Sequence, residues 1–127
     1  MRHIRLFVGG MACRQCVRTR AVELGMSLVD QTKIVTGASE LARNTVVYGG
    51  GGQMICEILT EGARTGLRLT FKDEGPGIAN LELAMMDGWT SGSGLGMGLS
   101  GTKRLVNEFD IDSNPGKGTR VTIIRWK

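Results

Sequence analysis

Residues 53–77 read QMICEILTEGARTGLRLTFKDEGPG, and this stretch decides the fold class that the sequence predicts. Gln53–Leu59 and Leu67–Lys72 are rich in apolar and β-branched residues, which is typical of strands, and the turn Glu61–Gly66 between them contains glycine. The acidic, glycine-containing segment Asp73–Gly77 follows directly on the second strand. We therefore expect a β-hairpin that ends in a short polar loop.

The segments on either side of this hairpin predict helices and further strands. Ser27, followed by Asp30 three residues later, predicts a capped helix start, and Gly25 and Gly49 suit helix ends. The expected elements are a strand at Ile4–Val8, helices at about Cys13–Leu24, from Ser27 to Tyr48 and at Asn80–Asp87, a flexible stretch at Gly88–Ser93, a helix at Gly96–Phe109, and strands at Asp110–Ser113 and Thr119–Trp126.

This order of elements predicts an α+β fold. We expect a two-layer α/β sandwich in which the helices cover one face of a mixed, mostly antiparallel sheet. The sequence shows no linker, internal repeat or low-complexity tail, so residues 1–127 are expected to form a single domain.

The composition argues against several classes of protein. The chain has 127 residues, with 41% hydrophobic and 22% charged residues and a formal net charge of +4, which is ordinary for a globular domain. No apolar run approaches the roughly 20 residues of a membrane span. The six aromatic residues are scattered, so nucleic-acid binding is not expected. Three spread cysteines favour a reducing cytoplasm, and helix packing is the preferred interpretation of Cys13 and Cys16.

Two pairs of polar residues are candidates for chemistry. Glu40 and Asn44 are four residues apart in an expected helix and therefore share a face. A carboxylate can take a proton from an attacking hydroxyl, and an amide oxygen can hold Mg²⁺. Asp73, at a strand end, can accept a hydrogen bond from an exocyclic amine such as N6 of adenine, and Thr119 could share that contact. Taken singly, these residues also fit a solvated helix face and ordinary turns.

The glycine run Gly92–Leu99 precedes an expected helix. Its backbone N–H groups and the helix N-terminus are typical of an anion site. The run lacks the Walker pattern and the strand that the Rossmann fingerprint requires. A flexible lid over phosphates and a disordered loop both remain open.

Together and in this order, these segments resemble the GHKL (Bergerat-fold) ATPase superfamily. Its N-box is matched by Glu40 and Asn44, its G1 box by Asp73–Gly77, its G2 box by Gly94–Gly98, and its terminal Gly-Thr by residues 118–119. The resemblance covers nearly the whole chain. Within the superfamily, the chain looks most like the stand-alone serine/threonine switch kinases of bacterial stress signalling.

The resemblance implies binding of ATP with Mg²⁺ under a flexible lid, and phosphorylation of a STAS-domain antagonist protein. Glu40 would be the general base and Asn44 a nucleotide-binding residue that also holds magnesium. Asp73 would bind adenine with help from Thr119. Arg14 matches an arginine on the partner-binding face of related kinases. The remaining nucleotide-binding residues would be Gly75, Gly77, Ile78, Gly94, Leu95, Gly96, Met97, Gly98 and Leu99.

Two alternatives remain from the sequence. One is an anti-sigma factor, which binds a sigma factor and phosphorylates its antagonist. The other is a nucleotide-gated module that docks to and activates a PP2C-type phosphatase, but such a module has no need of a base at Glu40. The first strand could also pair with another chain and form a homodimer. Neither nucleic acid nor a membrane is expected as a partner.

Overall fold

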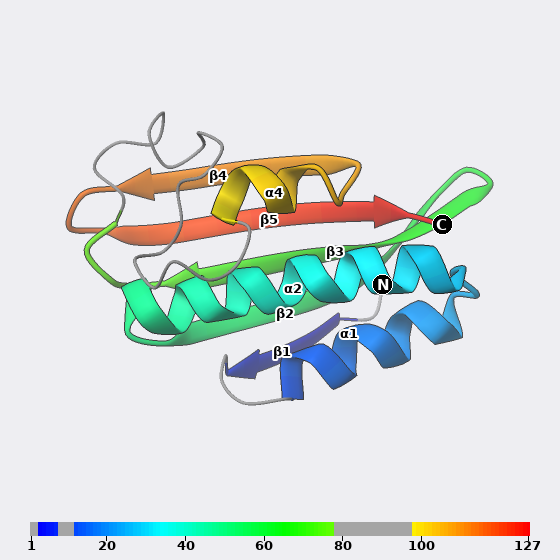
Figure 1. The fold of residues 1–127 in the computed structure, drawn as a ribbon, viewed down its shortest axis with the longest axis horizontal. Coiled ribbons are helices and arrows are strands. Elements are labelled where there is room, and N and C mark those ends of the chain that lie inside the picture. Colours follow the sequence, from blue (N-terminus) through cyan, green and yellow to red (C-terminus); the bar gives the residue numbers. More distant parts are fainter. Residues whose placement is uncertain (1–2, 8–11, 78–97) are drawn as a thin grey trace.

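A computed structural model describes residues 3–7, 12–77 and 98–127 (Figure 1). The predicted helix at residues 80–87 and the flexible stretch at residues 88–93 lie outside these ranges. In chain order the elements are β1 (His3–Phe7), α1 (Ala12–Glu23), α2 (Leu28–Gly49), β2 (Gly52–Glu61), β3 (Arg64–Asp73), α4 (Gly98–Lys103), β4 (Glu108–Asn114) and β5 (Gly118–Trp126).

The strands form one five-stranded sheet in the order β1-β2-β3-β5-β4. All four strand pairings among the described residues are antiparallel. The sheet was predicted to be mixed and mostly antiparallel, and in the described residues it is antiparallel throughout. The predicted hairpin is confirmed, since β2 pairs with β3 from Gly52–Asp73 at one end to Glu61–Arg64 at the turn. The strand order places β3 at the centre of the sheet and β1 and β4 at its edges.

The helices α1, α2 and α4 lie on one face of the sheet, which confirms the predicted α+β two-layer arrangement (Figure 1). Alternate residues of β3 point toward these helices, because successive side chains of a strand face opposite sides. Leu67, Leu69 and Phe71 are buried in this way. They pack in one core with residues of the helices and other strands, including Val17, Ala21, Ile34, Ala38, Leu41, Met54, Cys56 and Ile123. Within the described ranges, no helix has the length and apolar character needed to cross a membrane.

The boundaries of α2 follow the capping residues in the sequence. Ser27 is the N-cap, and its hydroxyl accepts a hydrogen bond of 3.1 Å from the backbone N–H of Asp30. At the other end Gly50 adopts a left-handed conformation with φ of +73°, which favours glycine. Gly51 N then donates to the Thr45 carbonyl at 3.0 Å. The predicted start of this helix is confirmed, and its end lies one residue later than predicted, since Gly49 is still helical and Gly50 is the cap.

The predicted helix at Gly96–Phe109 is wrong at its C-terminal end. The helix α4 ends at Lys103, and Phe109 lies in β4, which begins at Glu108. Asn107 accounts for the change, because its N–H donates to the Ile124 carbonyl at 2.9 Å and its side chain accepts from Trp126 N at 2.7 Å. These bonds to β5 align the chain for strand pairing, and Phe109 then packs against the core.

An ion pair joins the start of α2 to the end of β5. Arg125 Nη2 donates to Asp30 Oδ1 at 2.6 Å, while Arg125 Nη1 donates to the Leu105 carbonyl at 3.1 Å. Both charged side chains are largely buried, with 15% of Arg125 and 23% of Asp30 exposed. The hydrogen bond from Arg125 lowers the pKa of the Asp30 carboxyl below its usual value of 3.8. The pair therefore stabilises the fold when Asp30 is ionised.

Replacing Asp30 with asparagine should lower the free energy of unfolding by about 1–2 kcal/mol near neutral pH, because Arg125 loses a charged hydrogen-bond partner. Since the folded-state pKa of Asp30 lies below 3.8, its stabilisation is fully present above pH 3.8 and is lost as the pH falls through the folded-state pKa. Urea unfolding should therefore show that the difference in free energy of unfolding between wild type and Asp30→Asn becomes smaller in acid.

Asp112→Asn is the matched control. Asp112 pairs with Arg120 at 3.5 Å and both side chains are about half exposed, so its loss should cost less than about 0.5 kcal/mol. A pH-independent difference between wild type and Asp30→Asn would contradict the ion-pair explanation.

Candidate functional site

The predicted residues Asp73 and Thr119 are direct cross-strand partners at one end of the sheet. They close the β3–β5 ladder, where Asp73 pairs with Thr119 in the register. Gly118, one residue earlier, adopts φ of +88°, and a Cβ at this position would overlap the Asp73 carbonyl oxygen. Only a residue without a side chain allows this close approach of the two strands. The site is therefore built on backbone packing between β3 and β5.

The carboxylate of Asp73 is held by its own turn. Gly75 N donates to Asp73 Oδ1 at 2.9 Å, which fixes the direction of the carboxyl group. Asp73 Oδ2 has no hydrogen-bond partner among the residues that the structure describes. A carboxylate oxygen with this free capacity can accept a hydrogen bond from an exocyclic amine.

The predicted pocket glycine Gly77 packs against the β4–β5 turn. It adopts φ of +78°, and a Cβ there would overlap the Asn114 carbonyl oxygen. Gly116 N donates to the Pro76 carbonyl at 2.7 Å in the same place. The loop after Asp73 and the hairpin turn before Thr119 are thus joined by hydrogen bonding and close packing, which brings two of the predicted boxes together.

Ser113, which the sequence analysis did not single out, contacts the predicted site residue Thr119. Its hydroxyl lies 2.7 Å from Thr119 Oγ1, and either oxygen could be the donor. Ser113 is also the cross-strand partner of Thr119 and is 9% exposed. The predicted strand included Ser113, and pairing it across the Asn114–Gly118 turn would have placed it opposite Thr119. That register was the signal that could have found it.

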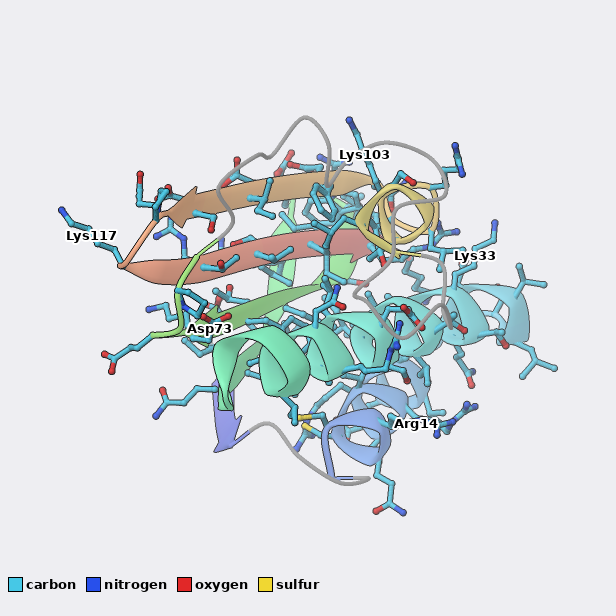
Figure 2. All side chains as sticks on the ribbon, turned by 60° about the vertical axis from the view of Figure 1, so that its left-hand side comes forward. Arg14, Lys33, Asp73, Lys103 and Lys117 are labelled. Atoms are coloured by element: carbon cyan, nitrogen blue, oxygen red, sulfur yellow. The ribbon has the colours of Figure 1, made fainter. Side chains whose placement is uncertain are left out.

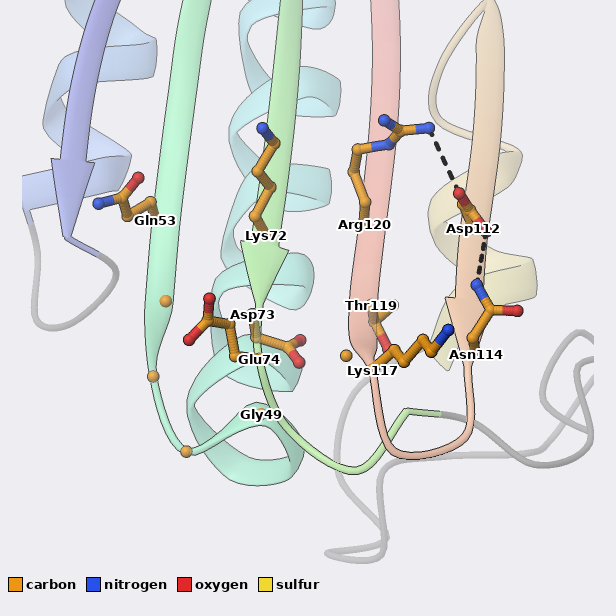
Figure 3. A pocket seen from close by; sticks show the side chains of 14 residues that line it. Gly49, Gln53, Lys72, Asp73, Glu74, Asp112, Asn114, Lys117, Thr119 and Arg120 are labelled. Atoms are coloured by element: carbon orange, nitrogen blue, oxygen red, sulfur yellow. Dashed lines mark hydrogen bonds and ion pairs between the residues drawn. The ribbon is translucent and has the colours of Figure 1, made fainter.

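A cavity of about 910 Å³ opens at this end of the sheet (Figure 3). Asp73, Glu74 and Thr119 are among its lining residues, and so are Lys72 and Arg120, which are the next cross-strand partners in the register of β3 and β5. The remaining lining residues are Gly49, Gly50, Gly51, Gly52, Gln53, Asp112, Asn114, Lys117 and Gly118. None of these was assigned to the nucleotide pocket from the sequence, although Gly118 belongs to the predicted terminal Gly-Thr motif.

Glu40 and Asn44 lie on α2, which leads directly to Asp73. The last helical residue, Gly49, lies so close to Asp73 that a Cβ on it would overlap the carboxyl group. With a rise of about 1.5 Å per residue, Asn44 lies roughly 7.5 Å and Glu40 roughly 13.5 Å back along the helix axis. The two side chains are one turn apart, as predicted. Glu40 and Asn44 thus lie on the helix whose end approaches Asp73, but neither is among the residues that line the cavity.

Glu40 is held by a salt bridge within its own helix. Arg43 Nη2 lies 3.1 Å from Glu40 Oε2, and the Glu40 side chain is 15% exposed. The ion pair restricts the direction of the carboxylate in a largely water-excluded position. Such a carboxylate can act as a proton acceptor if a hydroxyl approaches it.

The side-chain oxygen of Asn44 has the properties of a metal ligand. Its Oδ1 is buried and has no hydrogen-bond partner, a property that it shares with only one other side-chain atom in the described part of the chain. An unpaired buried carbonyl oxygen costs free energy unless something binds it. A hard cation such as Mg²⁺ prefers oxygen ligands and commonly combines few protein ligands with substrate phosphates. Residues 3–7, 12–77 and 98–127 contain no cluster of three or more acidic, histidine or cysteine ligands.

The other predicted residues are distributed as follows. Arg14 is exposed on α1 and is not among the residues that line the cavity (Figure 2). Gly98 begins α4, and Leu99 is buried in the core. The predicted positions Ile78, Gly94, Leu95, Gly96 and Met97 lie outside the described residues.

Known proteins resemble this chain over most of its length. The family model described as histidine kinase-, DNA gyrase B-, and HSP90-like ATPase matches residues 29–127. The serine/threonine-protein kinase RsbT of Bacillus subtilis is 44% identical over 116 residues, which cover 91% of this chain and 87% of that protein. An anti-sigma F factor of Clostridium acetobutylicum is 30% identical over 85% of this chain and 78% of its own length. Another from a Geobacillus strain is also 30% identical, over 89% of this chain and 81% of its own length.

The contact between Gly118 and Asp73 can be tested by two alanine substitutions. Gly118→Ala should lower the free energy of unfolding by about 2–3 kcal/mol and weaken ATP binding, because it combines left-handed strain with a backbone clash that displaces Asp73. Gly116→Ala is the matched control, since Gly116 has φ of +79° but open space around it. It should cost about 1 kcal/mol and preserve ATP affinity. Urea unfolding and calorimetric titration measure both effects, and equal losses in the two variants would contradict the role of the contact.

Proposed function

This chain belongs to the histidine kinase-, DNA gyrase B- and HSP90-like ATPase family, and we propose that it is a serine/threonine protein kinase. It transfers the γ-phosphoryl group of ATP to a serine or threonine of a STAS-domain antagonist, as part of partner-switching regulation in bacterial stress signalling. The 44% identity to a serine/threonine-protein kinase over 91% of the chain supports this proposal. The family match agrees with the superfamily that the four sequence segments resemble.

The observation that carries the proposal is the approach of the C-terminal end of α2, the helix that carries Glu40 and Asn44, to Asp73 at the end of β3. Asp73 Oδ2, which has no partner in the described residues, accepts from N6 of adenine at the helix C-terminus. Thr119 assists from the neighbouring strand. The phosphates then extend back along α2 toward Asn44 and Glu40. Phosphoryl transfer depends mainly on positioning and charge neutralisation, and this arrangement provides for both.

Glu40 acts as the general base. Its carboxylate accepts the proton of the attacking serine or threonine hydroxyl as the new oxygen–phosphorus bond forms. The bond between the γ-phosphorus and the β–γ bridging oxygen breaks, and ADP leaves. Arg43 holds Glu40 in one direction through the 3.1 Å salt bridge. General-base help of this kind contributes roughly 10²–10⁴ in rate.

Asn44 would hold Mg²⁺ through its buried Oδ1. The ion, when bound, neutralises negative charge on the phosphates. Asn44 would be one protein ligand, and phosphate oxygens of the nucleotide and water would be the other ligands that Mg²⁺ commonly takes.

An anti-sigma factor is the second candidate function. The observation that favours it is the 30% identity to anti-sigma F factors over 85–89% of this chain. Such a protein would bind a sigma factor in addition to phosphorylating an antagonist. Arg14, which is exposed on α1, is the proposed contact with a protein partner in either case.

The kinase assignment predicts a specific effect of Glu40→Gln. Purified STAS-domain proteins encoded in the same genome should gain a phosphoryl group, measured by intact mass, when incubated with this protein, ATP and Mg²⁺. Glu40→Gln should slow the transfer by about 10²–10⁴-fold while ATP affinity is retained. Glu61→Gln is the matched control, because Glu61 also pairs with an arginine three residues later, at 2.9 Å, but at the exposed β2–β3 turn.

Two outcomes would contradict this assignment. Full phosphoryl-transfer activity in Glu40→Gln would show that Glu40 is not the general base. A wild-type protein that binds ATP but phosphorylates no STAS protein would instead favour a sigma-binding or phosphatase-docking module.

Asn44→Ala tests the metal assignment separately from turnover. The substitution should weaken ATP binding about ten-fold with Mg²⁺ present, equivalent to roughly 1.4 kcal/mol, and should have little effect with EDTA. Because Oδ1 makes no hydrogen bond, the thermal unfolding midpoint of the free protein should not fall. Equal weakening with and without Mg²⁺ would show that Asn44 contacts the nucleotide rather than the ion.

A further inference from the structure

We propose that Ser113 is a positioning residue for the base of the nucleotide. It fixes the Thr119 hydroxyl as a hydrogen-bond acceptor, and the site thereby selects adenine over purines that carry a carbonyl at C6. Ser113 does not contact the base and acts through Thr119. This inference rests on the proposed nucleotide site at Asp73 and Thr119 and adds to it a residue that determines which base is bound.

Three polar residues form one row across the end of the sheet. Asp73 of β3 is the cross-strand partner of Thr119 of β5, and Thr119 is also the partner of Ser113 of β4. Directly opposite residues of antiparallel strands have Cβ atoms about 4.5–5.5 Å apart, so neighbouring side chains in the row can interact. Asp73 and Thr119 line the cavity, whereas Ser113 is buried and is not among the described residues that line it (Figure 3). A ligand in the cavity therefore meets Thr119 but not Ser113.

The Ser113 hydroxyl contacts two groups of β5. It donates a hydrogen bond to the Gly118 carbonyl at 3.3 Å, and it lies 2.7 Å from Thr119 Oγ1. The backbone of Gly118 is closely packed, because a Cβ at this position would overlap the Asp73 carbonyl oxygen. Ser113 therefore connects the Thr119 side chain to a part of the backbone that has little room to move.

These two contacts determine the direction of the Thr119 hydroxyl proton. A serine hydroxyl has one proton to donate, and a backbone carbonyl can only accept. While Ser113 donates its proton to Gly118, the 2.7 Å contact requires the proton of Thr119, so Thr119 donates to Ser113. The remaining lone pair of Thr119 Oγ1 is then available to a ligand, and toward the cavity Thr119 acts as an acceptor.

An acceptor at Thr119 beside the Asp73 carboxylate selects the chemistry of the base. Asp73 Oδ2 has no hydrogen-bond partner among the described residues, so it is a second acceptor in the same row. The amino group at C6 of adenine has two N–H donors and matches two neighbouring acceptors, whereas guanine has an acceptor oxygen at C6, which both groups would repel. Without Ser113, the Thr119 hydroxyl can turn and donate to such an oxygen, and the selectivity falls.

The ratio of the dissociation constants for ITP and ATP measures this selectivity, because the base of ITP carries a carbonyl at C6 where adenine carries the amino group. Calorimetric titration of the full chain with Mg²⁺ present should give a ratio of about ten or more for wild type. Ser113→Ala should lower the ratio about five-fold, which is the effect of one neutral hydrogen bond. Ser113→Cys keeps the shape of the side chain but hydrogen bonds weakly, so it should lower the ratio in the same direction, and it decides the point if Ser113→Ala fails to fold.

A double-mutant cycle separates positioning of Thr119 from a structural role of Ser113. Thr119→Val removes the hydroxyl and should itself lower the ITP/ATP ratio. Adding Ser113→Ala to Thr119→Val should leave the ratio unchanged, because Ser113 acts only through that hydroxyl. Thr70→Val is the matched control, since Thr70 is also 9% exposed and lies opposite another hydroxyl residue of β5, Thr122, but on the other face of the sheet. Its ratio should equal that of wild type.

Three results would overturn the inference and leave the nucleotide site in place. One is an unchanged ratio in folded Ser113→Ala while Asp73→Asn lowers it. Another is an equal loss of affinity for ATP and ITP in Ser113→Ala, which would indicate a structural role. The third is a further fall of the ratio when Ser113→Ala is added to Thr119→Val. A wild-type ratio near one, or a ratio that Asp73→Asn does not change, would instead contradict the adenine contact at Asp73 and this inference together with it.

Discussion

The close approach of Gly118 to the Asp73 backbone is the contact on which the site depends. It joins the end of β3 to the start of β5 at the place where the polar residues of both strands meet. A side chain at Gly118 would force the strands apart, and Asp73 would lose its position opposite Thr119. The second contact, between Gly77 and Asn114, extends the same packing into the loop after Asp73. Gly118 and Gly77 are needed here because neighbouring backbone leaves no room for a side chain, and not because the chain must be flexible.

The site combines rigid backbone with two unsatisfied oxygens. Asp73 Oδ2 has no partner among the described residues, and Asn44 Oδ1 is buried without one. Buried polar atoms in folded proteins are usually paired, so the buried Asn44 Oδ1 has an acceptor position that a ligand can use. Asn44 lies on α2, whose last residue Gly49 lies close to Asp73 at the end of β3, and this placement supports the proposed nucleotide site. Folding therefore orients the Asp73 and Asn44 side-chain oxygens before any ligand binds.

Much of this architecture could be predicted from local sequence. Ser27, Gly25 and Gly50 define helix ends through capping and left-handed backbone, which depend on neighbouring residues only. The C-terminal end of α4 could not be predicted in the same way, because Phe109 fits both a helical and an alternating pattern. Its placement in β4 depends on hydrogen bonds that join Asn107 to Ile124 and Trp126 of β5, and these partners lie seventeen and nineteen residues later in the chain. The burial of Asn44 Oδ1 likewise depends on how the helices pack on the sheet, and no local sequence pattern encodes that packing.

The central position of β3 has a consequence for how the protein fluctuates. Its backbone is hydrogen bonded to β2 on one side and to β5 on the other, so its amides should exchange with solvent only when much of the molecule opens. Asp73 is the last residue of this strand, at the border between a slowly exchanging core and a glycine-containing loop. The Asp73 carboxylate, which we propose as the adenine contact, is therefore anchored to the part of the chain that should open least often.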